Sequence, residues 1–311
     1  MTPRVTAAAC LLAAATVGAA QEFRSSVDLV TVPIVVTGRG GEAVTRAITA
    51  ADFRVFEDGV EQTVTLLDRQ RLPTSVCILL DSSMSMRGWK QRLATAALDH
   101  LFRRLQPEDE VAVVSVAATV GLALPWTPAP RIPRVDWDRW RVGGTTPLVD
   151  AVQLALHVTN QAANPRSVVL IVSDGLDNNS RISLSQLATT RRQSETLVYA
   201  VRTVELAVPV TPSGRPAPAA SSLASEPVHD VLDSLVGDSG GVVYDVAIPQ
   251  RAEASARAFF DDLESQYVLG YVPKKPADGT YRRLKVEPVE PDWHVRHRGG
   301  YLSQPLLPRS Q

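Results

Sequence analysis

Three oxygen-bearing side chains follow one strongly apolar stretch of this chain at alternate positions. Residues 76–80 are apolar without interruption, which predicts a strand buried on both faces. Asp81, Ser83 and Ser85 come directly after it. A carboxylate and two hydroxyls offer oxygen but no nitrogen or sulfur, which suits Mg²⁺, Mn²⁺ or Ca²⁺ rather than zinc or copper. The spacing therefore predicts a site for a hard cation at the carboxyl end of a strand.

Two later stretches carry groups of the same kind. Gly143-Gly144-Thr145 opens a predicted helix, and Asp174 ends a predicted buried strand over residues 167–173. In open parallel sheets, ligands bind outside the carboxyl ends of the strands. Asp81 and Asp174 would repel each other in one crevice, and a divalent cation would neutralise both. The competing interpretation is that these residues only form turns and helix caps, which Ser and Asp also favour.

The elements that position these groups alternate between strand and helix, which predicts a doubly wound, mostly parallel α/β sheet. Residues 119–124 follow the preceding strand too closely for a helical crossover, so we expect an antiparallel edge strand there. The segment 125–142 must then return across the sheet. The other predicted strands are 76–81, 111–116, 167–173, 197–203 and 241–244, and the helices are 89–105, 147–160, 183–194 and 229–236.

The two flanks have β patterns. Pro33 lies in a strand pattern and predicts an edge strand or a bulge. Asp58-Gly59 predicts a hairpin that joins residues 53–56 to residues 63–67. A helix over 252–264 leads to strand patterns around 267–271 and 284–286, and a final strand is expected over 293–297. Because an isolated hairpin is marginal in water, we expect both flanks to pack together as one small β-rich domain into which the α/β unit is inserted.

The first twenty residues are typical of a signal peptide. Arg4 precedes a short, alanine-rich apolar run, and small residues at Gly18 and Ala20 predict cleavage before Gln21. The run is shorter than the ~20 residues of a spanning helix, so we expect an exported protein, periplasmic or extracellular, without a membrane span after cleavage. The resulting division is a signal peptide (1–20), an N-terminal β segment (21–72), an α/β domain (73–248), a C-terminal helix and β segment packing with 21–72 (249–303) and a tail (304–311).

Composition limits the partners. A formal net charge of −1 over 311 residues argues against nucleic acid, which usually meets a strongly basic face. Cys77 would be the one cysteine left after cleavage, and it lies in the buried strand, where a thiol behaves as a small hydrophobic group.

The three motifs together resemble those of von Willebrand factor type A domains. Asp81-Ser82-Ser83-Met84-Ser85 resembles the family's Asp-x-Ser-x-Ser motif, Gly143-Gly144-Thr145 its threonine motif and Ser173-Asp174-Gly175 its third motif. The resemblance extends over about residues 74–246. The flanks are similar to exported bacterial proteins with a "VWFA-related domain", on the basis of Asp52-Phe53, Glu57-Asp58-Gly59, Ser265 to Tyr271 and Gly300-Tyr301.

The resemblance implies a metal-ion-dependent adhesion site. Its ligands would be Asp81, Ser83, Ser85, Thr145 and Asp174, and one coordination position would stay open for a carboxylate of a partner protein. We expect Mg²⁺ first, and Mn²⁺ or Ca²⁺ as substitutes. Thr146 adjoins Thr145, and we favour Thr145 because it follows the glycine pair directly. Asp177, Asn178 and Asn179 are interpreted as a solvated turn, with a supporting role beside the cation as the alternative.

The predicted function is a non-enzymatic adhesion or protein-interaction module. One alternative is a periplasmic assembly or scaffold factor whose metal is structural. A second is a serine hydrolase, because residues 237–241 spell Gly-Asp-Ser-Gly-Gly around Ser239, although no fitting histidine and aspartate are apparent. The loop 208–227 and Trp126, Trp137 and Trp140 could contact a partner. The tryptophans could equally cover the sheet edge or pack on the β-rich domain.

Overall fold

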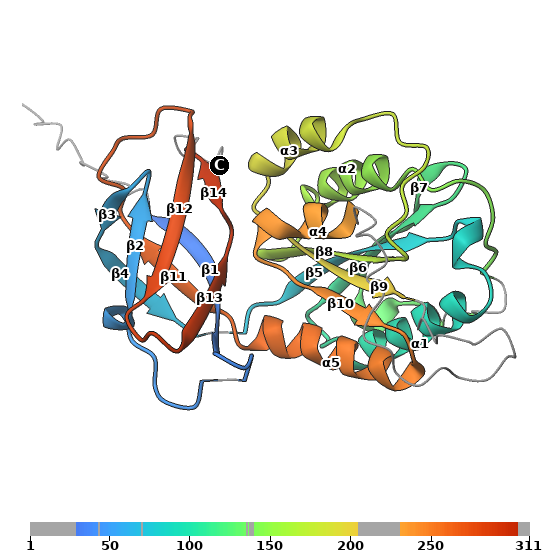
Figure 1. Ribbon diagram of the computed structural model, residues 1–311, viewed down its shortest axis with the longest axis horizontal. Helices are drawn as coiled ribbons and strands as arrows, with labels where there is room; N and C mark the ends of the chain where they lie inside the picture. The colour runs from blue at the N-terminus through green and yellow to red at the C-terminus, as the bar shows by residue number, and fades with distance from the viewer. Residues whose placement is uncertain are drawn as a thin grey trace, which may run out of the picture.

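The computed structural model describes residues 29–42, 44–69, 71–134, 136, 140–204 and 231–303. Two parts lie side by side, one β-rich and one with helices on both faces of a sheet (Figure 1). The predicted signal peptide, the loop 208–227, Trp137 and the tail 304–311 lie outside the described residues. Within the described residues, we find no helix with the length and apolar character needed to span a bilayer.

A six-stranded sheet forms the centre of the larger part, in the order β10-β9-β8-β5-β6-β7. The first five strands in that order are parallel, and β7 pairs antiparallel with β6 at the edge, as the short connection predicts. All of β5 is buried, in agreement with its apolar sequence. The strands are β5 (Thr74–Asp81), β6 (Glu110–Val116), β7 (Val120–Pro128), β8 (Arg166–Ser173), β9 (Leu197–Thr203) and β10 (Val243–Val246).

Helices cover both faces of this sheet, so the predicted doubly wound α/β class is confirmed (Figure 1). On one face α1 and α5 share a core with β5 and β9, and on the other α2, α3 and α4 pack against the same strands. The sequence analysis groups residues 249–264 with the C-terminal β segment, but Phe259 and Phe260 of α5 lie in the α/β core. The helices are α1 (Trp89–Arg104), α2 (Leu148–Thr159), α3 (Leu184–Arg192), α4 (Val231–Val236) and α5 (Pro249–Glu264).

The β-rich part consists of two four-stranded antiparallel arrays, β13-β1-β11-β4 and β14-β12-β2-β3. Strands from before and after the α/β unit alternate in the first array, and in the second the two groups meet at the β12–β2 pair, so the two flanks pack together as predicted. One apolar core lies between the arrays. The strands are β1 (Val30–Gly38), β2 (Phe53–Glu57), β3 (Val60–Gln62), β4 (Val64–Asp68), β11 (Tyr267–Tyr271), β12 (Tyr281–Pro288), β13 (Trp293–His297) and β14 (Gly300–Leu302).

Four details of the strand prediction differ from the structure. Strand β1 is internal rather than an edge, but β13 pairs with it only from Ile34 onward, so Pro33 lies where β1 has a partner on one side. The Asp58-Gly59 turn joins β2 to the short β3, whereas the expected partner, residues 63–67, forms β4 in the other array. The predicted final strand β13 is followed by β14, and β7 continues to Pro128 beyond its predicted end.

A buried polar cluster joins the strands of the β-rich part. Glu57 accepts hydrogen bonds from the hydroxyls of Tyr271 and Tyr301, each at 2.7 Å, and from Arg282 Nη1 at 2.8 Å. Burial, and then the bond to Glu57, raises the pKa of Tyr301 to about 12, so the phenol stays a donor at neutral pH. Arg282 also donates to the carbonyls of Lys275 and Pro276. The charge of Glu57 is therefore compensated by donors from three other segments.

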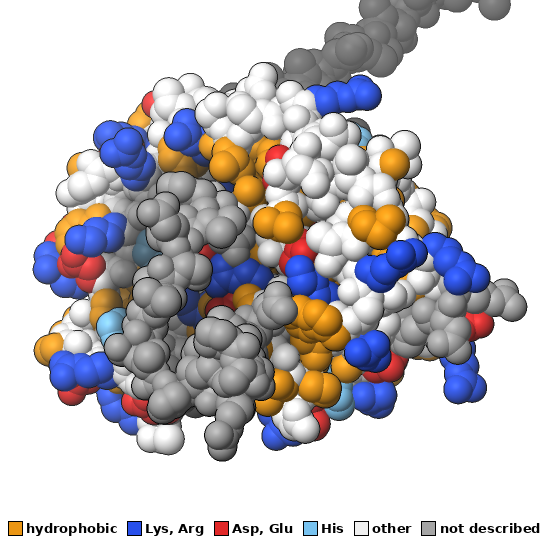
Figure 2. Space-filling view, turned by 45° about the vertical axis from the view of Figure 1, so that its right-hand side comes forward, with side chains coloured by type: hydrophobic (Ala, Val, Ile, Leu, Met, Phe, Trp, Pro, Cys, Tyr) orange, Lys and Arg blue, Asp and Glu red, His pale blue; other side chains and the backbone are white. Residues whose placement is uncertain are grey.

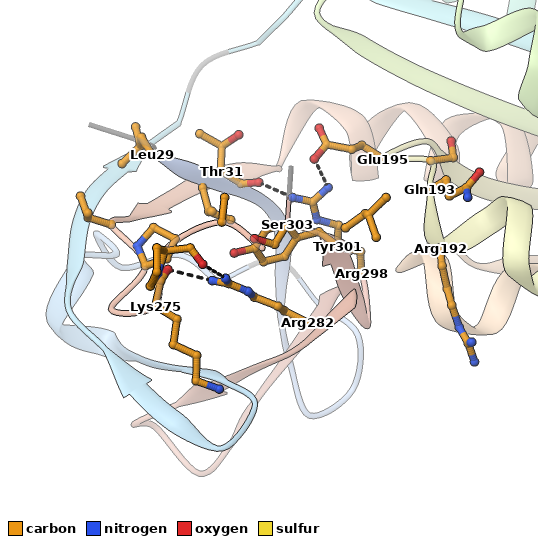
Figure 3. A pocket seen from close by; sticks show the side chains of 17 residues that line it. Leu29, Thr31, Arg192, Gln193, Glu195, Lys275, Arg282, Arg298, Tyr301 and Ser303 are labelled. Carbon is orange, nitrogen blue, oxygen red and sulfur yellow. Dashed lines mark hydrogen bonds and ion pairs between the residues drawn. The ribbon is translucent and has the colours of Figure 1, made fainter. Parts of the chain in front are cut away.

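A cleft of about 520 Å³ separates the two parts beside the end of α3 (Figure 3). Arg298 bridges it, because Nη2 donates to the Thr31 carbonyl at 2.9 Å and Nη1 pairs with Glu195 Oε1 at 2.5 Å. A second contact joins Arg296 Nη2 to Asp262 Oδ2 of α5 at 2.5 Å. The β-rich part is thus fastened to the α/β part at the end from which β5 enters the sheet (Figure 1).

Candidate metal centre

The structure brings the three predicted motifs to one edge of the central sheet. Asp81 and Asp174 follow the neighbouring parallel strands β5 and β8, as the sequence predicts. The glycine motif is fastened to the first motif by two backbone hydrogen bonds, from Gly143 to the Ser82 carbonyl at 2.8 Å and from Met84 to the Gly144 carbonyl at 3.2 Å. Residues that lie far apart in the chain therefore meet at one rim of the sheet, the side at which its parallel strands end.

The carboxylate of Asp81 is completely buried and held at both oxygens. Oδ1 accepts a hydrogen bond from the backbone of Ser83 at 2.9 Å, and Oδ2 accepts one from the Ser173 hydroxyl at 2.5 Å. Desolvation raises the pKa of Asp81, the nearby charge of Asp174 adds to the increase, and the two serine bonds oppose it. Burial thus disfavours the charged form of this carboxylate, and a cation beside it would offset that cost.

Two neutral oxygens lie next to that carboxylate in the sequence and next to each other in space. Ser83 Oγ and Ser85 Oγ are 2.9 Å apart on the short helical turn Met84–Met86. Ser83 is buried and Ser85 is half-buried. The pair offers hydroxyl oxygens without adding charge.

The threonine loop depends on Gly144. Its φ is +81°, and a Cβ atom there would lie 2.6 Å from the backbone nitrogen of Ala118, so only glycine fits. Thr145 is exposed, and its hydroxyl accepts a hydrogen bond from Asn179 Nδ2 at 3.2 Å. Thr146 is buried, and its backbone is paired with Asn178. Of the two threonines, Thr145 has the accessible side chain.

Residues 177–179 form a turn in which Asn178 and Asn179 are exposed, as expected, but their side chains and that of Asp177 also hold neighbouring segments. Asp177 Oδ1 accepts hydrogen bonds from the backbone of Leu148, at the start of α2, at 2.8 Å and from the Ser180 hydroxyl at 2.5 Å. A carboxylate is favourable there because the first turn of a helix has unpaired N–H groups and a partial positive charge. With the amides of Asn178 and Asn179, this loop fixes the threonine motif against the third motif.

Asp174 already has a positively charged neighbour that the sequence analysis missed. Lys90 Nζ, on the first turn of α1, donates to Asp174 Oδ2 at 2.7 Å, and the Asp174 side chain is only 2% exposed. The other oxygen, Oδ1, accepts a hydrogen bond from the backbone of Leu176 at 3.3 Å. The only available signal was a lysine five residues after Ser85, and its partner is 84 residues further along the chain.

The donor set fits a hard divalent cation. Among the described residues no group of three or more His, Cys, Asp or Glu side chains is placed to hold a metal, so a cation here would need the hydroxyl oxygens besides Asp81 and Asp174. Oxygen donors of mixed charge are those that Mg²⁺ and Ca²⁺ accept. The buried Asp81 carboxylate, which has no ion-pair partner among the described residues, is the feature that favours such an ion most.

Of the three tryptophans considered as partner contacts, Trp126 and Trp140 are described, and both pack within the α/β part. Trp126 donates its indole N–H to the Val158 carbonyl at 3.1 Å, and Trp140 donates to Ser82 Oγ at 2.7 Å. Both are partly buried against the two cores of the sheet. Their packing agrees with the interpretation that they cover the sheet edge, and Trp140 in addition supports the first motif.

Ser239 is a turn residue between α4 and β10. Its buried hydroxyl donates towards the Val236 and Val198 carbonyls, at 2.8 and 3.1 Å, and accepts from the backbone of Val198 at 3.0 Å. The neighbouring glycines permit close packing: a Cβ on Gly240 would lie 2.8 Å from the backbone of His297, and one on Gly241 would overlap the Val198 carbonyl. Ser239 and Gly241 thus pack within the α/β part, whereas Gly240 packs against the β-rich part.

Comparison with known proteins gives the class of the α/β part. Residues 76–176 match the model of the von Willebrand factor type A domain, a stretch that contains all five candidate ligands. The resemblance seen in the motifs is therefore confirmed for these residues. A search of curated proteins gives no match.

Several solved structures are similar at low identity. BatB from Bacteroides thetaiotaomicron, a conserved hypothetical protein, is 16% identical with a TM-score of 0.43, over 62% of this chain and 100% of that one. A von Willebrand factor type A protein from Catenulispora acidiphila is 13% identical with a TM-score of 0.46, over 91% of this chain and 65% of that one. The PilB minor pilin from Streptococcus sanguinis is 9% identical with a TM-score of 0.41, over 64% and 63%.

Proposed function

We propose that this chain is an exported, cation-dependent protein-interaction module rather than an enzyme. Asp81, Ser83, Ser85, Thr145 and Asp174 would hold one divalent cation, Mg²⁺ first, at the rim of the α/β part. When bound, the cation would supply an open coordination position for a carboxylate oxygen of a partner protein. The observation that carries the proposal is the buried Asp81 carboxylate beside two adjacent serine hydroxyls. The family match over the same residues supports it.

The surroundings of the site suit a protein partner. Met84 and Leu176 flank the candidate ligands with side chains that are 51% and 43% exposed, although both are large and apolar. Figure 2 turns the right-hand side of Figure 1 forward and shows apolar side chains mixed with charged side chains of both signs. Because this face carries both signs, attraction of an acidic group would depend on the local cation rather than on a broad basic surface.

Each residue has a separable role. Asp81 and Asp174 would supply the negative charge that selects a divalent cation, and Ser83 and Ser85 would complete the shell without adding charge. The bonds from Ser173 and from the backbone of Ser83 fix the orientation of Asp81 before any ligand arrives. Such preorganisation reduces the ordering cost of binding.

The first experiment measures cation binding by calorimetry and by the shift in Tm with Mg²⁺ or Mn²⁺ against EDTA. We expect binding by the wild type and its loss in the double variant Ser83→Ala/Ser85→Ala. Ser185→Ala, an exposed serine on α3, is the matched control. The proposal is refuted if Mg²⁺, Mn²⁺ and Ca²⁺ all fail to bind the folded wild type.

The second experiment separates an adhesive cation from a structural one. The wild type and Asp174→Asn are used to capture envelope proteins in Mg²⁺ or in EDTA, while circular dichroism follows the fold. Capture that is lost in EDTA with the fold intact supports the interaction module. Unfolding in EDTA favours the alternative of an assembly or scaffold factor with a structural metal. The hydrolase alternative instead requires labelling of Ser239 by a fluorophosphonate, which we do not expect because its hydroxyl is buried.

A further inference from the structure

Lys90 places a cation of the protein's own beside the candidate metal ligands. Its Nζ donates to Asp174 Oδ2 at 2.7 Å, in a contact where the Lys90 side chain is 20% exposed and that of Asp174 is 2% exposed. The backbone of Leu176 binds the other oxygen of Asp174. Both oxygens of this carboxylate are therefore engaged before any metal arrives.

The ammonium and a divalent cation would perform the same electrostatic task. Asp81 and Asp174 follow adjacent strands, and a positive charge at Asp174 relieves the repulsion between them. A second positive charge close to Nζ would be repelled by it, and the low exposure of the pair reduces screening by water. Simultaneous binding of the ammonium and a divalent cation at Asp174 is thus unfavourable, so binding of either one weakens binding of the other.

We propose that Lys90 is an internal competitor for the cation, a role that rests on the proposed metal site. In the metal-free protein Lys90 holds the Asp174 side chain in place and reduces the repulsion between the carboxylates of Asp81 and Asp174. On cation binding it releases Asp174 Oδ2. The competition lowers the affinity of the site and shifts its loading to higher cation concentrations.

The affinity test compares the Kd for Mn²⁺ of the wild type, Lys90→Met, Lys90→Arg and Lys285→Met. Lys285 is a matched control, because its side chain is 70% exposed and pairs with Glu287 in the β-rich part. Removal of one nearby unit charge should lower the Kd of Lys90→Met by about tenfold or more. Lys90→Arg, which keeps the charge, and Lys285→Met should stay close to the wild type.

The outcomes separate the two proposals. If wild type and Lys90→Met bind Mn²⁺ with the same Kd, the metal site stands and the competition is refuted. If neither of them binds Mn²⁺, the proposed function fails and the competition fails with it. In EDTA we also expect a lower Tm for Lys90→Met and a larger increase on addition of Mn²⁺, because within the described part of the chain Lys90 is the one ion-pair partner of these two carboxylates.

A measurement on the wild type avoids the risk that a variant fails to fold. Lysine acylation by a water-soluble N-hydroxysuccinimide ester is followed by mass spectrometry with and without Mg²⁺. If the cation displaces Nζ from Asp174, the acylation rate of Lys90 rises severalfold while that of Lys285 is unchanged. An unchanged or lower rate at Lys90, under conditions where calorimetry shows cation binding, would overturn the inference.

Discussion

Glu57→Gln should destabilise the chain strongly, because it removes the one carboxylate in a buried polar cluster. Glu57 and Arg282 are each about 1% exposed, and their side chains are 2.8 Å apart. Loss of one partner of a buried ion pair costs about 3–5 kcal/mol, because the remaining charge is left without compensation. Weakening of the hydrogen bonds from Tyr271 and Tyr301 to Glu57 adds to this loss of stability, since a hydrogen bond to a charged group contributes about 1.5–3 kcal/mol.

The magnitude can be tested by urea unfolding of the full chain, followed by circular dichroism. We expect a loss of at least about 3 kcal/mol for Glu57→Gln and about 1.5 kcal/mol for Tyr271→Phe, which removes one of three donors. The control is Glu61→Gln on the same hairpin. Its pair with Arg54 is exposed, so the loss should be much smaller than that of Glu57→Gln. A Glu57→Gln variant as stable as this control would refute the reasoning.

Three further predictions concern single side chains. His297 Nε2 accepts a hydrogen bond from the backbone N–H of Val286, and burial lowers the pKa of this histidine. The unfolded chain therefore binds the proton at a higher pH than the folded chain, so stability should fall as the pH drops below about 6.5. Tm measured against pH should show this fall, and a less steep one in His297→Gln. Gly240→Ala should lower stability by about 1–3 kcal/mol in urea unfolding, since φ is +90° and the new Cβ would meet His297. Burial raises the pKa of Cys77 to about 12, so peptide mapping should find it alkylated by iodoacetamide in urea but not in the native chain; native labelling would contradict its burial.

The sequence was sufficient for elements whose pattern is local. Unbroken apolar runs predicted the buried strands, and their alternation with helices predicted the doubly wound class. Neighbouring parallel strands end at the same side of a sheet, so the prediction that Asp81 and Asp174 meet required only that their two strands be adjacent, as β5 and β8 are. That step needed no side-chain detail.

The features that the sequence analysis did not predict depend on contacts with distant segments or on elements too short to show a pattern. Pro33 is tolerated because β13 begins to pair only one residue later, which no window of β1 can show. Strand β3 has three residues, too few for a period to be recognised. The bond from Lys90 and the capping of α2 by Asp177 join segments 84 and 29 residues apart, and they became visible only when the strands had been placed.

The flanking motifs concern the stability of the β-rich part rather than binding at the cation. Glu57, Tyr271 and Tyr301 meet in the buried cluster, and a Cβ on Gly300 would overlap the Arg282 carbonyl. The β-rich part lies at the end of the sheet where β5 enters, opposite the rim that carries Asp81 and Asp174 (Figure 1). A partner can therefore approach that rim without meeting the β-rich part. It follows that Glu57→Gln should lower the Tm and yet leave the Kd for Mn²⁺ unchanged at temperatures where the variant is folded.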